Sequence, residues 1–267
     1  MKLKHLLFLS TLLSLMACSD DSPATPDSPE TPEQPDITNS VEKLVTMDVS
    51  QTYQTIAGFG ASDCWAPSFV GKSWTSGRAG ITELLFSSEI VNGKPKGIGL
   101  SQWRVNLGGG SAQQGDASGI EDKSRRAESY LKDDLTLDWS RCEGQRYFMS
   151  RAKELGCDNF ILFSNTPPVQ YTYNGKGFSV QGASSNLKKE HYDDFAGYMT
   201  EVAAHYTGEG YNVTHISPVN EPQYNWDGGQ EGSGWTNDQV AKLVRELDAS
   251  LTASGLSTDI LLGESGD

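Results

Sequence analysis

The stretch His-Ile-Ser-Pro-Val-Asn-Glu-Pro-Gln-Tyr-Asn-Trp, residues 215–226, joins a short apolar run to polar and aromatic side chains. The apolar run indicates a buried strand that ends at Asn220 and Glu221. A carboxyl group partly withdrawn from water holds its proton more readily, as a general acid must, and an amide can both donate to and accept from a sugar hydroxyl. Pro222 disfavours helix at Glu221, so we expect extended backbone there. Ordinary strand-to-loop junctions use the same residue types, so the tripeptide alone leaves both interpretations open.

Four further stretches have the nearly continuous apolar composition of strands that helices cover on both sides. Between them, spaced apolar residues predict helices. Ser140 and Glu143 have the spacing of a capping box, and Gly156 stands where such a helix would end. A second helix is predicted over about Lys188–Tyr206, and a third opens with Thr236 and Gln239. The five strands are expected to run into Gly58–Ser62 and over Ser101–Leu107, Asn159–Ser164, His215–Asn220 and Asp259–Gly263.

This βαβαβ order predicts an α/β fold with a parallel sheet, and two architectures compete. A doubly wound nucleotide-binding sheet needs a phosphate-binding glycine set, but Asp63 occupies the place of the third glycine after Gly58 and Gly60. A (β/α)8 barrel instead places polar residues at the carboxyl end of every strand. The sequence shows this pattern, so we favour the barrel; the residues are Ser62 and Asp63, Arg104 and Asn106, Ser164 and Asn165, Asn220 and Glu221, and Glu264 and Ser265.

The amino terminus has the features of a bacterial lipoprotein signal. Residues 1–17 contain a basic start and an apolar segment too short to span a bilayer, and they end in Leu-Met-Ala before Cys18. We expect Cys18 to be lipidated and residues 18–40, with a proline at about every third position, to form a semi-rigid tether. The acidic residues after Cys18 resemble a surface-export signal. The expected location is the bacterial outer membrane, at the cell surface, with the lipid anchor as the only membrane contact.

Charge and cysteine content limit the partners. The formal net charge of −14 argues against nucleic acid or anionic lipid as the partner and favours a neutral ligand. The three cysteines after Cys18 cannot all pair within the chain. No Cys-x-x-Cys occurs and the histidines lack the spacing of a metal-binding helix, so neither a metal nor a cofactor is expected.

Four motifs in register carry a family resemblance. They are Gly58-Phe-Gly-Ala-Ser62, Trp103-Arg-Val-Asn-Leu-Gly-Gly109, Ser164-Asn-Thr-Pro-Pro168 and Asn220-Glu-Pro222. In this order the chain resembles glycoside hydrolase family 30, and the Tyr171-Thr-Tyr-Asn-Gly175 segment is similar to the branch that holds endo-β-1,6-galactanases. The resemblance implies a retaining glycosidase on a TIM barrel with a small side β-sandwich, and a polysaccharide or oligosaccharide as its substrate.

The resemblance also implies roles for individual residues. Glu221 matches the general acid/base, Asn220 its partner at the sugar, and Arg104 an arginine near the nucleophile. Short strands over Val41–Met47 and Thr52–Ile56 would belong to the side sandwich. We expect the remaining substrate contacts to come from two amides and three aromatic rings, Asn106, Asn165, Tyr171, Tyr224 and Trp226.

The family takes its nucleophile from strand seven, whereas the partial barrel domain, residues 41–267, ends after strand five. Glu264 has no nucleophile role in the family pattern. We therefore expect this chain to be part of a longer enzyme and inactive by itself. The leading hypothesis is an endo-acting hydrolase of β-linked galactan or glucan. The alternatives are a surface glycan-binding lipoprotein without catalysis and, less supported, a nucleotide-dependent enzyme.

Overall fold

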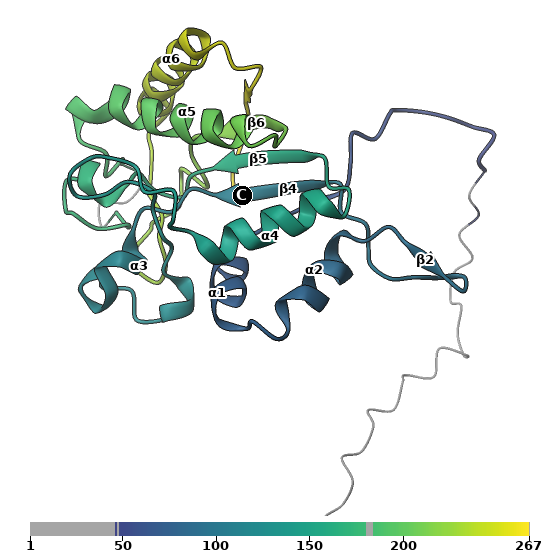
Figure 1. The fold of residues 1–267 in the computed structure, drawn as a ribbon. Coiled ribbons are helices and arrows are strands. Elements are labelled where there is room, and N and C mark those ends of the chain that lie inside the picture. Colours follow the sequence, from purple (N-terminus) through teal and green to yellow (C-terminus); the bar gives the residue numbers. More distant parts are fainter. Residues whose placement is uncertain (1–45, 47, 180–183, 267) are drawn as a thin grey trace, which may run out of the picture. The chain divides into compact units, whose positions relative to one another are not determined.

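The computed structural model describes residues 46, 48–179 and 184–266 (Figure 1). The predicted signal peptide, Cys18, the tether and all but Thr46 of the first predicted sandwich strand lie outside these residues. The chain divides into two compact units, residues 1–53 and 54–267. The sheet, the helices and the candidate site all belong to the second unit.

All five predicted strands are present and form one parallel sheet. The second and third strands are β4 and β5, and three of the five residues of each are buried. The sheet follows the chain order without a reversal, β1-β4-β5-β6-β7. A doubly wound nucleotide-binding sheet requires a reversal of strand order, so this topology is of the barrel type. The bounds are β1 Gly60–Ser62, β4 Gln102–Asn106, β5 Asn159–Phe163, β6 Val213–Ser217 and β7 Asp259–Ile260.

The outer strands each pair on one side only, so within the described residues the barrel does not close. The predicted incomplete (β/α)8-type fold is therefore confirmed. One set of residues paired from strand to strand runs across the whole sheet, so its members lie at the same level along the strands. Because every strand is parallel, all carboxyl ends meet at one edge. The set consists of Ser62, Arg104, Ile161, His215 and Asp259.

The three predicted helices are also present and their apolar stripes face inward. In α5, Phe195, Met199 and Val202 are fully buried, and in α6 Leu243 and Leu247 are. The two helices lie side by side, whereas α1 packs against α4 (Figure 1). None of the described helices is long and apolar enough to cross a membrane. The bounds are α1 Ala66–Ser73, α2 Arg78–Phe86, α3 Ser111–Gln114, α4 Glu143–Glu154, α5 Tyr192–Gly208 and α6 Asn237–Ser254.

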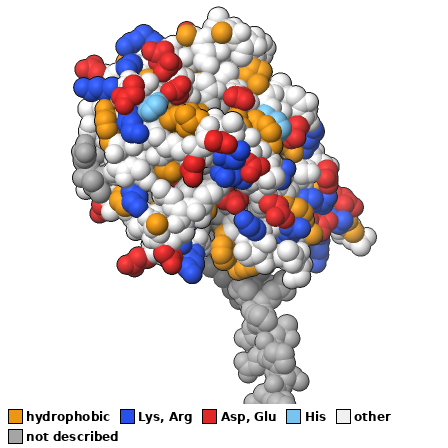
Figure 2. Space-filling view, turned by 60° about the vertical axis from the view of Figure 1, so that its left-hand side comes forward, with side chains coloured by type: hydrophobic (Ala, Val, Ile, Leu, Met, Phe, Trp, Pro, Cys, Tyr) orange, Lys and Arg blue, Asp and Glu red, His pale blue; other side chains and the backbone are white. Residues whose placement is uncertain are grey.

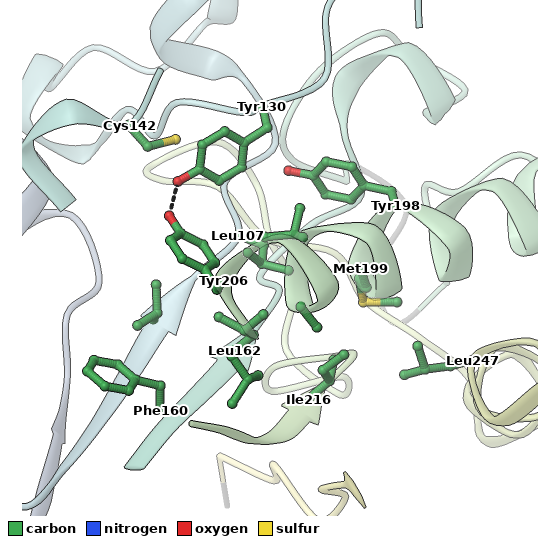
Figure 3. Packing of buried hydrophobic residues seen from close by; sticks show 14 of the residues in the cluster. Leu107, Tyr130, Cys142, Phe160, Leu162, Tyr198, Met199, Tyr206, Ile216 and Leu247 are labelled. Atoms are coloured by element: carbon green, nitrogen blue, oxygen red, sulfur yellow. Dashed lines mark hydrogen bonds between the residues drawn. The ribbon is translucent and has the colours of Figure 1, made fainter. Parts of the chain in front are cut away.

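The core lies between the sheet and these helices (Figure 3). Leu162 of β5 and Ile216 of β6 face Met199 of α5 there, and all three are completely buried. The hydroxyl groups of Tyr130 and Tyr206 share a hydrogen bond across the cluster (Figure 3). Burial raises the pKa of both phenols well above the ordinary value, so both stay neutral.

The second predicted sandwich strand, Thr52–Ile56, is wrong. These residues are exposed and irregular, with a bend at Gln54. Among the described residues no neighbouring strand offers them backbone hydrogen bonds. An isolated segment gains too little from extended backbone to offset its lost conformational entropy.

The predicted signals for helix starts and ends are confirmed at two positions and wrong at one. Thr236 and Gln239 form the reciprocal bonds of a capping box at the start of α6, and Gly156 ends α4 with a φ of 96°. Ser140 does not cap α4, because its hydroxyl donates to Asp138 Oδ1 at 2.6 Å. Local side-chain bonds of this kind compete with helix capping. Sequence reasoning also missed α1, α2 and a hairpin of β2 Ile90–Val91 and β3 Lys94–Pro95.

The contact between α1 and α4 depends on two glycines. A Cβ atom at Gly71 would run into the backbone oxygen of Gly144, and one at Gly144 would run into the backbone oxygen of Ser68. We predict that Gly71→Ala lowers the free energy of unfolding by about 2 kcal/mol, because the helices must separate. Gly197 in α5 is a matched control with open space around it, and Gly197→Ala should raise stability by up to about 1 kcal/mol. Denaturant unfolding measures both, and equal effects would contradict this packing.

Candidate active site

One guanidinium group connects the carboxyl ends of four strands. Arg104 of β4 donates from Nη2 to Asn220 Oδ1, at 2.9 Å, and from Nη1 to Ser62 Oγ, at 3.2 Å. The same Nη2 forms an ion pair with Glu264 Oε2 at 3.0 Å, and only about a fifth of each side chain is exposed. Arg104 also lies over the ring of Phe163, with 3.5 Å from Cζ to the ring centroid. The structure therefore brings together Arg104 and Asn220, as expected, and adds Glu264.

Glu221 follows this cluster in a strained backbone conformation. Its φ is 43°, in the left-handed region that disfavours every residue except glycine, so the expected extended backbone is wrong. Hydrogen bonds hold the strain: the Glu221 N–H donates to the backbone oxygen of Glu264 at 2.8 Å, and the Glu221 carbonyl accepts from Tyr224 N–H at 3.0 Å. Such strain persists only where surrounding structure imposes it and is common at functional sites.

Glu221 is one of the residues that line a hollow of about 500 Å³. Tyr224 is more than half exposed there, and its ring lies 5.0 Å from that of Trp226. Trp226 itself is almost completely buried, and its Nε1 donates to the Glu221 carbonyl at 3.3 Å. Tyr224 can thus meet a ligand with its ring face, whereas Trp226 mainly supports the backbone of Glu221. The lining residues are Arg125, Glu221, Tyr224, Trp226, Asp227, Gly228, Gly229 and Gln230.

The two remaining predicted amides lie below the surface. Asn106 and Asn165 are 4% and 1% exposed, and each Oδ1 is buried with no hydrogen-bond partner in the described part of the chain. Asn165 donates from Nδ2 to the Cys64 thiol, with 3.2 Å between the atoms. Burial raises the pKa of this thiol to about 12, so it is uncharged and unreactive at neutral pH. Asn165 thus links the end of β5 to the segment that follows β1.

Tyr171 is a correction to the predicted set of substrate contacts. It packs within the hydrophobic core and its ring lies 4.9 Å from that of His191. Burial raises the pKa of its phenol to about 12. A residue that is only 6% exposed does not offer a ring face to a sugar.

Sequence reasoning missed Glu231, the buried acceptor that joins two loops of the site. Its carboxylate accepts from the backbone N–H groups of Gly109, at 2.7 Å, and Ser111, at 2.9 Å, and from the Ser111 hydroxyl. Desolvation raises the pKa of this carboxyl, and the hydrogen bonds oppose the shift. The glycine run before Ser111 was a usable signal, since successive N–H groups in such a turn bind anions. Here the anion is a carboxylate of the same chain.

No described cluster of histidine, cysteine or acidic side chains could hold a metal ion. The carboxyl of Asp63 lies next to the site but is fully enclosed. It accepts from Asn106 N–H at 2.9 Å and from Gln145 Nε2 at 2.7 Å, which fixes the end of β1 against β4 and α4. Despite these bonds, burial raises the pKa of Asp63 to about 7.

This pKa predicts a pH-dependent stability. An acid whose folded-state pKa is raised from 3.8 to about 7 contributes most below pH 3.8, and the contribution is lost as the pH rises through about 7. The amide of Asp63→Asn does not ionise, so this variant does not lose stability in the same pH range. Wild type should therefore weaken relative to D63N by up to about 1.4 kcal/mol per pH unit within this window. Unfolding titrations at several pH values measure this, with exposed Asp158→Asn as control. A difference that does not vary with pH would contradict the assignment.

A family model described as O-glycosyl hydrolase family 30 matches residues 42–267. An endo-β-1,6-galactanase of Hypocrea rufa is 27% identical over 234 residues, which are 80% of this chain and 47% of that protein. A crystal structure of a conserved exported protein from Bacteroides fragilis is 36% identical, with a TM-score of 0.78 over 82% of this chain and 46% of its own.

Two more distant structures share the fold. The catalytic domain of a family 30 xylanase C from Talaromyces cellulolyticus is 20% identical, with a TM-score of 0.57 over 82% of this chain and 48% of its own. An endo-β-1,6-glucanase is 19% identical, with a TM-score of 0.57 over 82% of this chain and 46% of its own. The chain spans about half the length of these relatives. Because the family model covers more than half of the sequence, the chain belongs to O-glycosyl hydrolase family 30.

Proposed function

We propose that this chain carries the acid/base half of a retaining, endo-acting glycoside hydrolase for β-linked galactan or glucan, with Glu221 as general acid/base. The observation that carries the proposal is the strained Glu221, which lines the hollow and directly follows Asn220, a partner of Arg104, in the chain. The Hypocrea rufa relative, named an endo-β-1,6-galactanase, makes β-1,6-galactan the first substrate to test.

In this mechanism Glu221 first gives its proton to the glycosidic oxygen as the bond to the anomeric carbon breaks. In the second step it removes a proton from the water that attacks the same carbon. The first step also needs a nucleophilic carboxylate about 5 to 5.5 Å from Glu221. We assign that role to no described residue. Glu264 is engaged by Arg104, and we assign it to holding that guanidinium in place.

The neighbouring residues have roles that follow from their contacts. The Arg104 bond to Asn220 Oδ1 fixes the orientation of this amide, so that its NH₂ group is set to donate to a sugar hydroxyl. The exposed ring of Tyr224 offers a flat apolar surface for one face of a pyranose. Asn165 acts on the structure of the site, because its bond to Cys64 links the end of β5 to the segment after β1.

A glycan-binding lipoprotein without catalysis is the second candidate. It would use the same hollow and the same exposed Tyr224, and it would need no nucleophile. The two candidates differ only in whether Glu221 transfers a proton. Replacing this one carboxyl by an amide of the same shape therefore distinguishes them.

We predict that Glu221→Gln lowers the turnover of β-1,6-galactan or β-1,6-glucan at least about 100-fold in the intact protein and leaves glycan affinity nearly unchanged. Product release measures turnover, and calorimetry measures affinity. Glu201→Gln, an exposed position on α5, is the matched control and should keep the wild-type rate. Wild-type turnover in E221Q would refute the assignment, and binding without turnover in the wild type would favour the second candidate.

We further propose that Cys18 anchors the protein to the outer membrane of a bacterium, with the folded domain at the cell surface. The support is the order of residues 15–18 and the proline-rich segment behind it. We predict that Cys18→Ala moves the protein from the membrane fraction to the soluble fraction, whereas Ser19→Ala does not. Fractionation followed by immunoblotting measures this. Retention of C18A in the membrane fraction would disprove lipidation at this residue.

A further inference from the structure

A second hollow, of about 350 Å³, is lined by the start of α5, the start of α6 and the segment that carries Tyr173. The two helices follow β5 and β6 along the chain, and a helix that follows a parallel strand begins near the carboxyl end of that strand. This second hollow is therefore at the same edge of the sheet as Glu221. It has no described lining residue in common with the hollow beside Glu221, so the two are separate places on the surface.

Tyr173 lines the second hollow with a ring that is held in place and yet accessible. The residue is 52% exposed. Its backbone N–H donates to the carbonyl of Asn186 at 2.9 Å, and its phenol oxygen accepts from the backbone N–H of Lys189 at 3.2 Å. Tyr171, two residues earlier, is only 6% exposed and belongs to the core. A ring that is already fixed loses little conformational entropy when the apolar face of a sugar stacks on it.

The second hollow also offers a fixed hydrogen-bond donor and an unoccupied acceptor. Gln239 Oε1 accepts from the backbone N–H groups of Ser185 and Thr236, both at 3.0 Å. Its oxygen is thus engaged, and its NH₂ group donates to no described residue. Asp238 is exposed, and its carboxylate has neither a hydrogen bond nor an ion pair with the described part of the chain. Such a pair suits sugar hydroxyl groups, which both donate and accept.

Charges of both signs line the second hollow, those of Lys189, Lys242 and Asp238. The Lys242 ammonium group lies 4.0 Å from the centroid of the Tyr192 ring and donates to the carbonyl of Lys189 at 3.2 Å. Figure 2 likewise shows acidic and basic side chains interspersed over one face of the molecule, without a broad area of one sign. A ligand without net charge fits such a lining better than an ion does.

Two connections join the second hollow to the active site. Trp235 donates from its backbone N–H to the carbonyl of Pro222 at 2.8 Å, and its ring lies 6.3 Å from that of Tyr192. The segment that begins at Tyr173 reaches the other hollow, because a Cβ atom at Gly228 would lie 3.2 Å from the ring of Phe178. A glycan long enough to extend beyond the hollow beside Glu221 can therefore reach the second hollow.

We propose that the second hollow is an accessory binding site for the neutral, β-linked hexose chain of the polysaccharide substrate. One pyranose stacks on the ring of Tyr173, and its hydroxyl groups bond to Asp238 and Gln239. Binding there holds a long chain near Glu221 and raises its local concentration, whereas a short oligosaccharide in the hollow beside Glu221 gains nothing. This inference rests on the proposed function for the identity of the glycan.

The test compares a long and a short substrate in the intact protein. The substrates are polymeric β-1,6-galactan and the β-1,6-linked galactose trisaccharide. The variants are Tyr173→Ala and Asp238→Ala, with Trp74→Ala as the matched control. Trp74 is 55% exposed, close to the value for Tyr173, and it lines neither hollow. Product release gives kcat and KM for both substrates, and calorimetry on the same variants combined with Glu221→Gln gives the Kd for uncleaved galactan.

We expect KM and Kd for galactan to rise about tenfold in Y173A and about threefold in D238A, and to stay unchanged in W74A. The kcat on galactan, and kcat/KM on the trisaccharide, should equal the wild-type values in all three variants. D238A tests the site even where loss of the Tyr173 hydroxyl destabilises its loop, because the Asp238 side chain has no described partner.

Unchanged affinity for galactan in both Y173A and D238A would overturn the accessory site and leave the proposed function intact. An equal loss on galactan and on the trisaccharide would also overturn it, because Tyr173 would then act on the catalytic hollow. Binding that depends on Tyr173 in a wild type without turnover would support the accessory site and overturn the proposed hydrolysis. A wild type that neither binds nor cleaves galactan would overturn both.

Discussion

The site depends on the contacts of one partly buried guanidinium. Arg104 has little access to water, so its charge must be matched by the surrounding groups. Those groups come from three other strands: Ser62 from β1, Asn220 after β6 and Glu264 after β7. The parallel sheet brings these ends to one edge, and the guanidinium fixes their spacing there. Glu221 directly follows Asn220 in the chain, and its N–H donates to the backbone oxygen of Glu264. The positions of Asn220 and Glu264 therefore determine that of Glu221.

Hydrogen bonds from the surrounding loops maintain the strained backbone of Glu221. The backbone of this residue is held in a left-handed conformation by Glu264 and by the segment that carries Tyr224. The same long loop returns to the sheet through Glu231, whose buried carboxylate joins it to Gly109. These bonds preorganise the site, which a proton-transferring carboxyl requires. A strained residue without such support would relax to extended backbone.

The sequence predicts the strands and the principal helices because their signals are local. Continuous apolar runs fix all five strands, and the pair Thr236 and Gln239 fixes the start of α6. The hairpin of β2 and β3 also has a local signal, the dipeptide Asn92-Gly93, which is typical of hairpin turns. Both residues adopt the positive φ that such a turn requires. The burial of Tyr171 depends on contacts between distant segments, which composition does not reveal. The strain at Glu221 likewise depends on tertiary bonds that override the preference imposed by the following proline.

The most direct test of the account is a crystal structure of the intact protein with Glu221→Gln and a bound β-1,6-linked oligosaccharide. The account predicts the new amide within about 3 Å of a glycosidic oxygen, with the Asn220 amide on a hydroxyl of the adjoining sugar. A sugar chain bound elsewhere, or an amide at position 221 turned away from the glycosidic oxygen, would contradict it.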